Sequence, residues 1–253
     1  MKLFAIADLH MDGGAGKPMD VFGPNWDRHC ERIFGSWQSM VSDEDTVLVP
    51  GDISWAMHLK DALPDLYALS ALPGKKVLLR GNHDYWWSSL TQMRAALPED
   101  VILIQNDAHD IGPAVVCGSR GWVLPGDAEF SAADRRIYNR ELIRLELSLG
   151  CAQRLANGEK PIICMMHFPP LLRDGKPNGF TELMERFGVA RCLYGHLHGS
   201  PAWEVGYDGE YNGVEYTLCS ADRLDFEPMQ IGEFPEPVPI EGSTEPEEEE
   251  HPQ

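Results

Sequence analysis

The sequence predicts a layered α/β fold, and three observations support this prediction. Short, continuously apolar runs, typical of strands buried on both faces, recur along the chain. Segments with helical periodicity separate most of these runs. Hydrophobic residues make up 43% and charged residues 24% of the 253 residues, as in an ordinary folded domain. Strands and helices that alternate in this way pack as layers.

Seven apolar runs are predicted as strands. They are Lys2–Ala7, Thr46–Val49, Lys76–Leu79, Val101–Ile104, Ala114–Cys117, Ile162–Met166 and Arg191–Tyr194. Three helices are predicted between them. Asn25 is expected to cap the first, whose apolar positions run from Cys30 to Val41. The second covers Ser54–Leu72, where Pro64 should break or kink it, and the third and longest covers Ser131–Ala156.

The pattern changes near the C-terminus. Trp203–Tyr207 and Val214–Cys219 are predicted as an antiparallel pair, because Asp-Gly and Asn-Gly turn sequences lie between them. After Gly232 the chain becomes rich in proline and glutamate and loses apolar periodicity. We therefore expect a folded domain over residues 1–232 and a disordered acidic tail over Glu233–Gln253.

The formal net charge of −19 is unevenly distributed, because eight glutamates lie in the tail and −11 remains on the other residues. Proteins that bind nucleic acid usually present basic surfaces, so extended nucleic acid is disfavoured as a partner. A small anionic substrate fits this charge if bound cations reverse the local field. The sequence leaves the oligomeric state open.

The sequence also indicates where in the cell the protein is expected. No apolar run approaches the about 20 residues that cross a bilayer, so no membrane partner is expected. The apolar run Leu3–Ala7 is too short for a signal peptide. The six cysteines show no C-x-x-C spacing and are expected to be free, mostly buried thiols. We therefore expect a cytoplasmic protein.

Side chains that can bind metal follow five of the predicted strands. They are Asp8, His10, Asp52, Asn82, His83, His167, His196 and His198. The carboxyl ends of parallel strands meet at one edge of a sheet, so these side chains should converge. Besides His83, the set suits two adjacent ions that share a carboxylate, and nitrogen and oxygen ligands without thiolate favour manganese, iron or zinc. Without a metal such a buried cluster would be costly.

These motifs resemble a known family. The order Asp8-x-His10, Gly51-Asp52, Gly81-Asn82-His83-Asp84, His167, Gly195-His196-x-His198 is similar to that of the calcineurin-like metallophosphoesterases. The motifs extend over residues 8 to 198, which is most of the predicted folded domain. The resemblance implies a four-layer α/β/β/α sandwich with a dinuclear metal site at the carboxyl ends of the strands.

The resemblance also implies a role for each residue. Asp8, His10, Asp52 and His198 would bind one divalent transition-metal ion. Asp52 would bridge to a second ion held by Asn82, His167 and His196. His83 would lie beside the substrate and donate a hydrogen bond or proton to the leaving oxygen, oriented by Asp84.

The implied activity is hydrolysis of a small phosphate mono- or diester by a hydroxide that bridges the two ions. Two alternatives remain open: a nuclease or cyclic-nucleotide phosphodiesterase of the same family, or a non-catalytic metal-binding scaffold. The acidic charge disfavours a nuclease. The presence of His83 and of every ligand position favours an enzyme.

The sequence departs from the family pattern at Trp55, where many members have a second aspartate in G-D-x-x-D. With Tyr85-Trp86-Trp87, this version resembles an uncharacterised bacterial phosphohydrolase subgroup of that family. These three aromatic residues could form a stacking wall for a substrate, although packing in the core is favoured. Arg120 could bind a substrate phosphate or be an exposed structural arginine.

Overall fold

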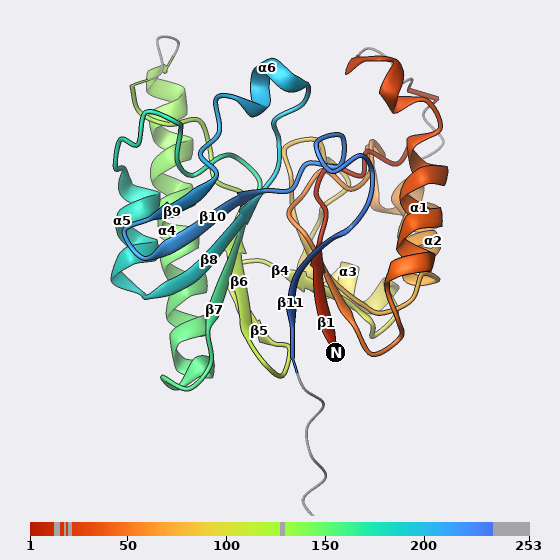
Figure 1. Ribbon diagram of the computed structural model, residues 1–253, viewed down its shortest axis with the longest axis horizontal. Helices are drawn as coiled ribbons and strands as arrows, with labels where there is room; N and C mark the ends of the chain where they lie inside the picture. The colour runs from red at the N-terminus through yellow and green to blue at the C-terminus, as the bar shows by residue number, and fades with distance from the viewer. Residues whose placement is uncertain (13–15, 18, 20–21, 127–129, 235–253) are drawn as a thin grey trace, which may run out of the picture.

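Two β-sheets pack face to face between two layers of helices (Figure 1). This arrangement is seen in a computed structural model that describes residues 1–12, 16–17, 19, 22–126 and 130–234. The layers follow the order helix, sheet, sheet, helix, so the predicted four-layer α/β/β/α sandwich is confirmed. No helix in these described ranges is both long and apolar enough to cross a membrane.

The first sheet has the strand order β11-β1-β2-β3-β4. Strands β1 to β4 are parallel, and β11 is antiparallel to β1 at the edge. The bounds are β1 (Lys2–Ala5), β2 (Thr46–Val49), β3 (Lys75–Leu79), β4 (Val101–Ile104) and β11 (Met229–Glu233). Because both faces of this sheet are covered, β1 to β4 have the continuous apolar sequences that predicted them.

The second sheet has the strand order β5-β6-β7-β8-β10-β9. Strands β6, β7, β8 and β10 are parallel, whereas β5 and β9 are antiparallel edge strands. The bounds are β5 (Ala108–Asp110), β6 (Val115–Ser119), β7 (Ile162–Met166), β8 (Val189–Tyr194), β9 (Gly209–Tyr211) and β10 (Val214–Leu218).

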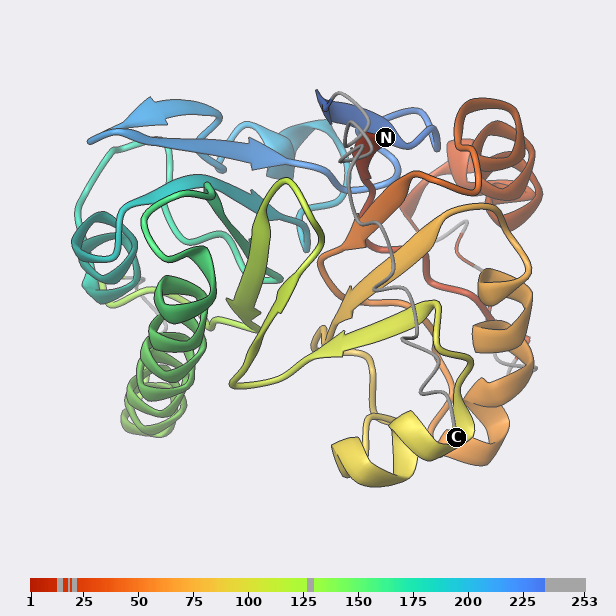
Figure 2. The same cartoon turned by 90° about the horizontal axis from the view of Figure 1, so that it is seen from below.

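Three hydrophobic cores join the four layers. Leu48 and Val77 of the first sheet meet Val116 and Met165 of the second. The outer faces of the sheets are covered by helices, as both views show (Figures 1 and 2). On the first sheet they are α1 (His29–Met40), α2 (Leu59–Ser70) and α3 (Leu90–Ala96), and on the second α4 (Ala132–Ala156) and α5 (Gly179–Arg186).

The longest predicted helix is confirmed as α4, and its start has a clear cause. The Ser131 side chain accepts a hydrogen bond from the Asp134 N–H (3.2 Å), and the Asp134 carboxylate accepts from the Ser131 N–H (2.9 Å). This capping box satisfies backbone donors that the first turn of a helix leaves free. Leu145 and Leu149 then bury the inner face of α4 against the second sheet.

The structure excludes a break at Pro64 and shows that the predicted cap at Asn25 is wrong. Pro64 does not break α2, which continues to Ser70. A proline inside a helix costs about 3 kcal/mol, but Leu66 and Leu69 beyond it are fully buried against the first sheet and outweigh that cost. Asn25 lies in a short 3-10 helix, and α1 begins only at His29.

The predicted strand Trp203–Tyr207 is also wrong. Its first residue ends the short helix α6 (Ser200–Trp203), and the antiparallel partner of β10 is β9. Asn212 and Gly213 join β9 to β10 with φ angles of 50° and 81°. Positive φ at both positions gives the tight turn that hairpins favour, so the turn was predicted correctly and the partner strand was not.

The end of the predicted domain is occupied by β11. Glu233 pairs with Lys2 in this strand, and the Phe234 N–H donates to the Met1 carbonyl (3.0 Å). The remainder of the predicted tail, residues 235–253, lies outside the described residues.

Candidate metal centre

The predicted ligands lie on loops that follow the strands at one edge of both sheets. After β1, the Asp8 N–H donates to the Gly51 carbonyl (3.0 Å) and the His10 N–H donates to the Asp52 carbonyl (3.0 Å). The residue before Asp8 donates its N–H to the Cys219 carbonyl at the end of β10 (2.7 Å). The end of β1 is therefore bonded to loops of both sheets, which brings their ligands together.

Four of these residues have left-handed backbone conformations. Their φ angles are 62° for Asp8, 43° for His10, 54° for Asp52 and 74° for His196. Such a conformation costs a non-glycine residue about 1–3 kcal/mol and persists only where the surrounding structure enforces it. Its repetition at successive strand ends marks this edge of the sandwich as a candidate functional site.

The glycines that precede the ligands allow close approach to the backbone. A Cβ atom on Gly195 would lie 2.5 Å from Asp8 Oδ2, and one on Gly81 would collide with Asp52 Oδ1. A side chain at either position would displace the carboxylate. The Gly-Asn and Gly-His pairs of the sequence thus make room for Asp52 and Asp8.

One half of the cluster, the His167 group, consists of His167, His196, Asn82 and Asp52. His167 Nε2 lies 2.6 Å from Asn82 Oδ1, 3.2 Å from His196 Nδ1 and 3.4 Å from Asp52 Oδ2. His196 Nδ1 lies 3.0 Å from Asn82 Oδ1. Ligands held about 2.0–2.2 Å from one ion lie about 3 Å from each other, so this group has the dimensions of a metal site.

The chemistry of the His167 group also fits a metal ion. His167 Nδ1 lies 3.1 Å from the Pro50 carbonyl oxygen, which can only accept, so Nδ1 carries the proton. His167 Nε2 therefore presents a lone pair to the Asn82 and Asp52 oxygens. These acceptors repel each other unless a cation lies among them. A carbonyl that fixes the tautomer of a histidine is a common feature of metal sites.

The other half, the His10 group, consists of His10, His198, Asp8 and again Asp52. His10 Nε2 lies 3.2 Å from His198 Nε2, which is 3.8 Å from Asp8 Oδ1. His198 Nδ1 lies 3.1 Å from Asp222 Oδ1, so this carboxylate orients the ring and directs Nε2 towards Asp8.

Asp52 belongs to both groups. Its Oδ2 atom lies 3.4 Å from His167 Nε2 and 3.7 Å from His10 Nε2. Its Oδ1 atom accepts a hydrogen bond from the His83 N–H (2.8 Å). A carboxylate between two ligand groups is the arrangement expected for a residue shared by two ions.

Electrostatics distinguish acids from bases in the cluster. Burial raises the pKa of Asp8 to about 7 and that of Asp52 to about 6. Burial lowers the pKa of His167 to about 3 and that of His196 to about 2, so both imidazoles are neutral at neutral pH. Neutral histidines beside buried carboxylates favour a bound cation.

The structure therefore brings together all the predicted ligands. Two combinations within the described residues, Asp8 with His10 and His198, and Asp8 with Asp52 and His167, have ligand atoms within 4.8 Å of one another.

Among the residues that the structure describes, no hydrogen bond joins the Asp84 carboxylate to the His83 ring, so the expected orienting role stays a prediction. The fully buried carboxylate of Asp84 accepts hydrogen bonds from other groups. These are the backbone N–H groups of Asp52 (3.0 Å), Ile53 (2.9 Å), Ser54 (3.2 Å) and Gly81 (2.7 Å), and Trp86 Nε1 (3.0 Å). Asp84 thus ties the loop after β2 to the loop after β3, which are the loops that present Asp52 and His83.

His83 lies beside the cluster and outside both ligand groups. Its ring is half-buried, 4.3 Å from the Trp55 ring and 5.8 Å from the His10 ring. Burial lowers its pKa, although the Asp52 charge acts in the opposite direction. Trp55 also stacks on the His10 ring (4.9 Å, 21°), so the residue that departs from the family pattern packs against both a predicted ligand and His83.

The secondary candidates differ in burial. Trp86 and Trp87 are buried in the core, as favoured, whereas Tyr85 is exposed. Arg120 is not an exposed arginine: its side chain is only 15% exposed, and its guanidinium lies 3.5 Å from Glu141. Its carbonyl accepts the His167 N–H (3.1 Å), which places Arg120 next to the metal ligands.

The family of the chain follows from a comparison with known families. The calcineurin-like phosphoesterase family matches residues 1–200, which contain every predicted ligand. The chain belongs to this family. No curated protein matches the chain.

Solved structures resemble this calcineurin-like phosphoesterase in fold alone. A protein of unknown function from Aquifex aeolicus, AQ665, has a TM-score of 0.50 and 15% identity, over 90% of this chain and 95% of that one. TT1561 of Thermus thermophilus has a TM-score of 0.48 and 14% identity, over 78% and 82%. Purple acid phosphatase PPD1 from yellow lupin (Lupinus luteus) seeds has a TM-score of 0.46 and 14% identity, over 96% and 46%.

The sequence analysis missed Asp222. Its Oδ1 atom holds His198, and its Oδ2 atom accepts the Gly199 N–H (2.8 Å). The sequence offered a clue to its role. Asp222 lies a few residues after the strand that begins at Val214, which was predicted, just as the predicted ligands lie after their own strands.

Proposed function

We propose that this calcineurin-like phosphoesterase hydrolyses small phosphate mono- or diesters with the help of two divalent transition-metal ions. The observation that carries the proposal is the pair of ligand groups that share Asp52, with acceptor atoms 2.6–3.4 Å apart in the His167 group. Nitrogen and oxygen donors without thiolate suit manganese, iron or zinc.

The proposed ligand assignment follows the two groups. Asp8, His10 and His198 would hold one ion, Asn82, His167 and His196 the other, and Asp52 would contact both. When bound, such ions act as Lewis acids towards phosphoryl oxygens and lower the pKa of water. They would also add positive charge where a protein of net charge −19 must bind an anionic substrate.

The other residues of the site donate a proton to the leaving group or position the ligands. His83 lies outside both groups with its ring half-buried, so its imidazole is placed to donate a hydrogen bond or proton to a leaving oxygen. Asp84 supports this role indirectly, because it holds the loops of Asp52 and His83 together. Asp222 fixes the tautomer and orientation of His198. The six free cysteines support a reducing, cytoplasmic location.

The test is a panel of phosphate mono- and diesters assayed with the full chain reconstituted with manganese, iron or zinc. We expect hydrolysis of at least one class, loss of hydrolysis on chelation, and its return with added metal. Full activity in a verified metal-free sample would contradict the mechanism. Binding of two ions without hydrolysis of any ester would favour the scaffold alternative.

A further inference from the structure

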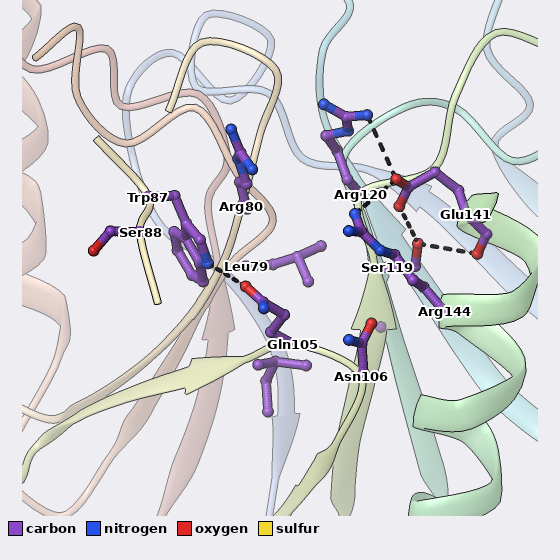
Figure 3. A pocket seen from close by; sticks show the side chains of 12 residues that line it. Leu79, Arg80, Trp87, Ser88, Gln105, Asn106, Ser119, Arg120, Glu141 and Arg144 are labelled. Carbon is purple, nitrogen blue, oxygen red and sulfur yellow. Dashed lines mark hydrogen bonds and ion pairs between the residues drawn. The ribbon is translucent and has the colours of Figure 1, made fainter. Parts of the chain in front are cut away.

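A cavity of about 110 Å³ lies between the two sheets, next to the candidate metal centre. Three arginines line it. Arg80 follows β3, Arg120 follows β6 and Arg144 belongs to α4. Figure 3 shows Arg80 on one side of the cavity and Arg120 and Arg144 on the other. Its volume is several times the about 30 Å³ that one water occupies in the liquid, so a tetrahedral oxyanion fits.

The cavity carries excess positive charge in an otherwise acidic protein. Glu141 is the acidic residue of its lining, and its Oε1 atom lies 2.9 Å from Arg144 Nη1 and 3.5 Å from Arg120 Nη2. Arg140, which lies outside the lining, adds a third guanidinium 3.5 Å from the same oxygen. One carboxylate therefore serves three guanidinium groups and leaves most of their donors for another acceptor.

Arg80 has still fewer partners. The described part of the chain contains no ion pair between Arg80 and a carboxylate. The Nε–H groups of both Arg80 and Arg120 are buried and make no hydrogen bond to other described residues. Leaving buried donors unpaired is costly. Planar guanidinium groups that face a shared space are suited to a phosphate or carboxylate group.

The cavity borders the His167 group. Arg80 lies two residues before Asn82 in the chain. On the other side, the Arg120 carbonyl accepts the N–H groups of His167 (3.1 Å) and Phe168 (2.9 Å). The cavity therefore adjoins the loops that carry Asn82 and His167, two of the proposed metal ligands.

We propose that this cavity binds an oxyanion, a phosphate or carboxylate group, beside the metal centre. The anion is either a second acidic group of the substrate, in addition to the phosphate that is hydrolysed, or a free anion. Its effect on hydrolysis rests on the proposed function, whereas its binding does not.

Binding is tested by titrating sulfate into the metal-loaded full chain and measuring the heat released. Arg80→Gln should raise the Kd at least tenfold. Arg120→Gln, on the opposite wall, should raise the Kd by a similar factor. In this variant Glu141 would still have Arg140 and Arg144 as partners, so its buried carboxylate would remain paired. This variant therefore tests the site if Arg80→Gln does not fold. Arg140→Gln is the matched control, because it removes the same charge beside Glu141 but outside the cavity. It should change the Kd less than twofold.

The source of the anion is tested with two phosphate monoesters that differ only in a second acidic group. If the substrate carries the anion, the doubly acidic ester should have at least a tenfold higher kcat/KM, and Arg80→Gln should reduce that preference while Arg140→Gln keeps it. If the anion is free, sulfate should alter hydrolysis of the simple ester in the wild type and not in Arg80→Gln.

Equal sulfate affinity in the wild type, Arg80→Gln and Arg120→Gln would overturn the proposal. A chain that hydrolyses neither ester but still loses sulfate affinity on Arg80→Gln would contradict the proposed function and leave the anion site standing.

Discussion

The two halves of the candidate metal centre are built differently. In the His167 group the ligand atoms lie within 3.4 Å of His167 Nε2, and a backbone carbonyl, that of Pro50, fixes the tautomer of His167. In the His10 group the spacings reach 3.8 Å, and a side chain from another loop, Asp222, orients His198. His10 Nδ1 is buried without a hydrogen bond to a described residue.

The difference lies in preorganisation and in competition with protons. Burial keeps His167 and His196 neutral, so Asp52 is the one group of that half whose pKa is raised. In the His10 group, burial raises the pKa of Asp8 to about 7. Burial lowers the pKa of His198, but the charges of Asp8 and Asp222 together outweigh burial, so the pKa lies above its usual value. We therefore expect the His167 group to bind its ion more tightly, because ligands must lose their protons to bind metal.

The largest effect should come from the residue that both halves share. Asp52→Asn removes the charge between the two groups, so both ions should be lost or weakened. We expect kcat/KM to fall by more than about 10⁴-fold, beyond what a positioned general acid supplies. Metal content measured by mass spectrometry of the purified variant would check the cause. Retention of two tightly bound ions would show that Asp52 is not shared.

His83→Ala separates catalysis from metal binding in either half. Both ions should be retained, and hydrolysis of alkyl phosphates should slow by about 10²–10⁴-fold, because an alkoxide needs a proton to leave. Nitrophenyl phosphates, whose leaving group departs with little protonation, should be slowed less. Equal slowing of both esters would mean that His83 only positions the phosphate. Loss of metal would make it a ligand.

Asp222→Ala should weaken one half alone. Removing the partner that orients a histidine ligand typically costs about 10–100-fold in metal affinity. We expect that loss for the weaker of the two ions, measured by titration with a competing chelator, and little change for the tighter one. Asp225→Ala removes an exposed aspartate from the same loop and serves as the control. Equal weakening of both ions would contradict the independence of the halves.

Lowering the pH should release the two ions in order. Protons compete with metal below about pH 7 at Asp8 and below about pH 6 at Asp52, so affinity falls as the pH decreases. The ion of the His10 group should therefore leave first, between about pH 7 and 6. Metal retention after dialysis at pH 8, 7, 6 and 5 checks this order. Simultaneous release of both ions would contradict the claim that the His167 group binds its ion more tightly than the His10 group.

The sequence predicted the fold well where hydrophobic patterns are continuous. Strands buried on both faces, such as β2 and β7, were found with their correct bounds, and α4 was predicted to begin one residue early, at its N-cap Ser131. The edge strands β5, β9 and β11 were missed, because none of their residues is fully buried and they carry little apolar signal. Pro64 does not end α2, because tertiary burial overrides local propensity.

The site was predictable for a topological reason. Parallel strands bring their carboxyl ends to one edge, so residues as distant as Asp8 and His198 meet there. Supporting contacts were harder to foresee, since they depend on how the loops pack. The Pro50 carbonyl behind His167 leaves no side-chain signal, and the role of Asp84 emerges only from the donors that surround it.

The most direct test of the paired metal centre is a crystal structure of the full chain grown with Mn²⁺, with anomalous scattering used to locate manganese. We predict two peaks, one among Asp8, His10 and His198 and the other among Asn82, His167 and His196, with Asp52 in contact with both. A single peak, or peaks that Asp52 does not touch, would contradict the account.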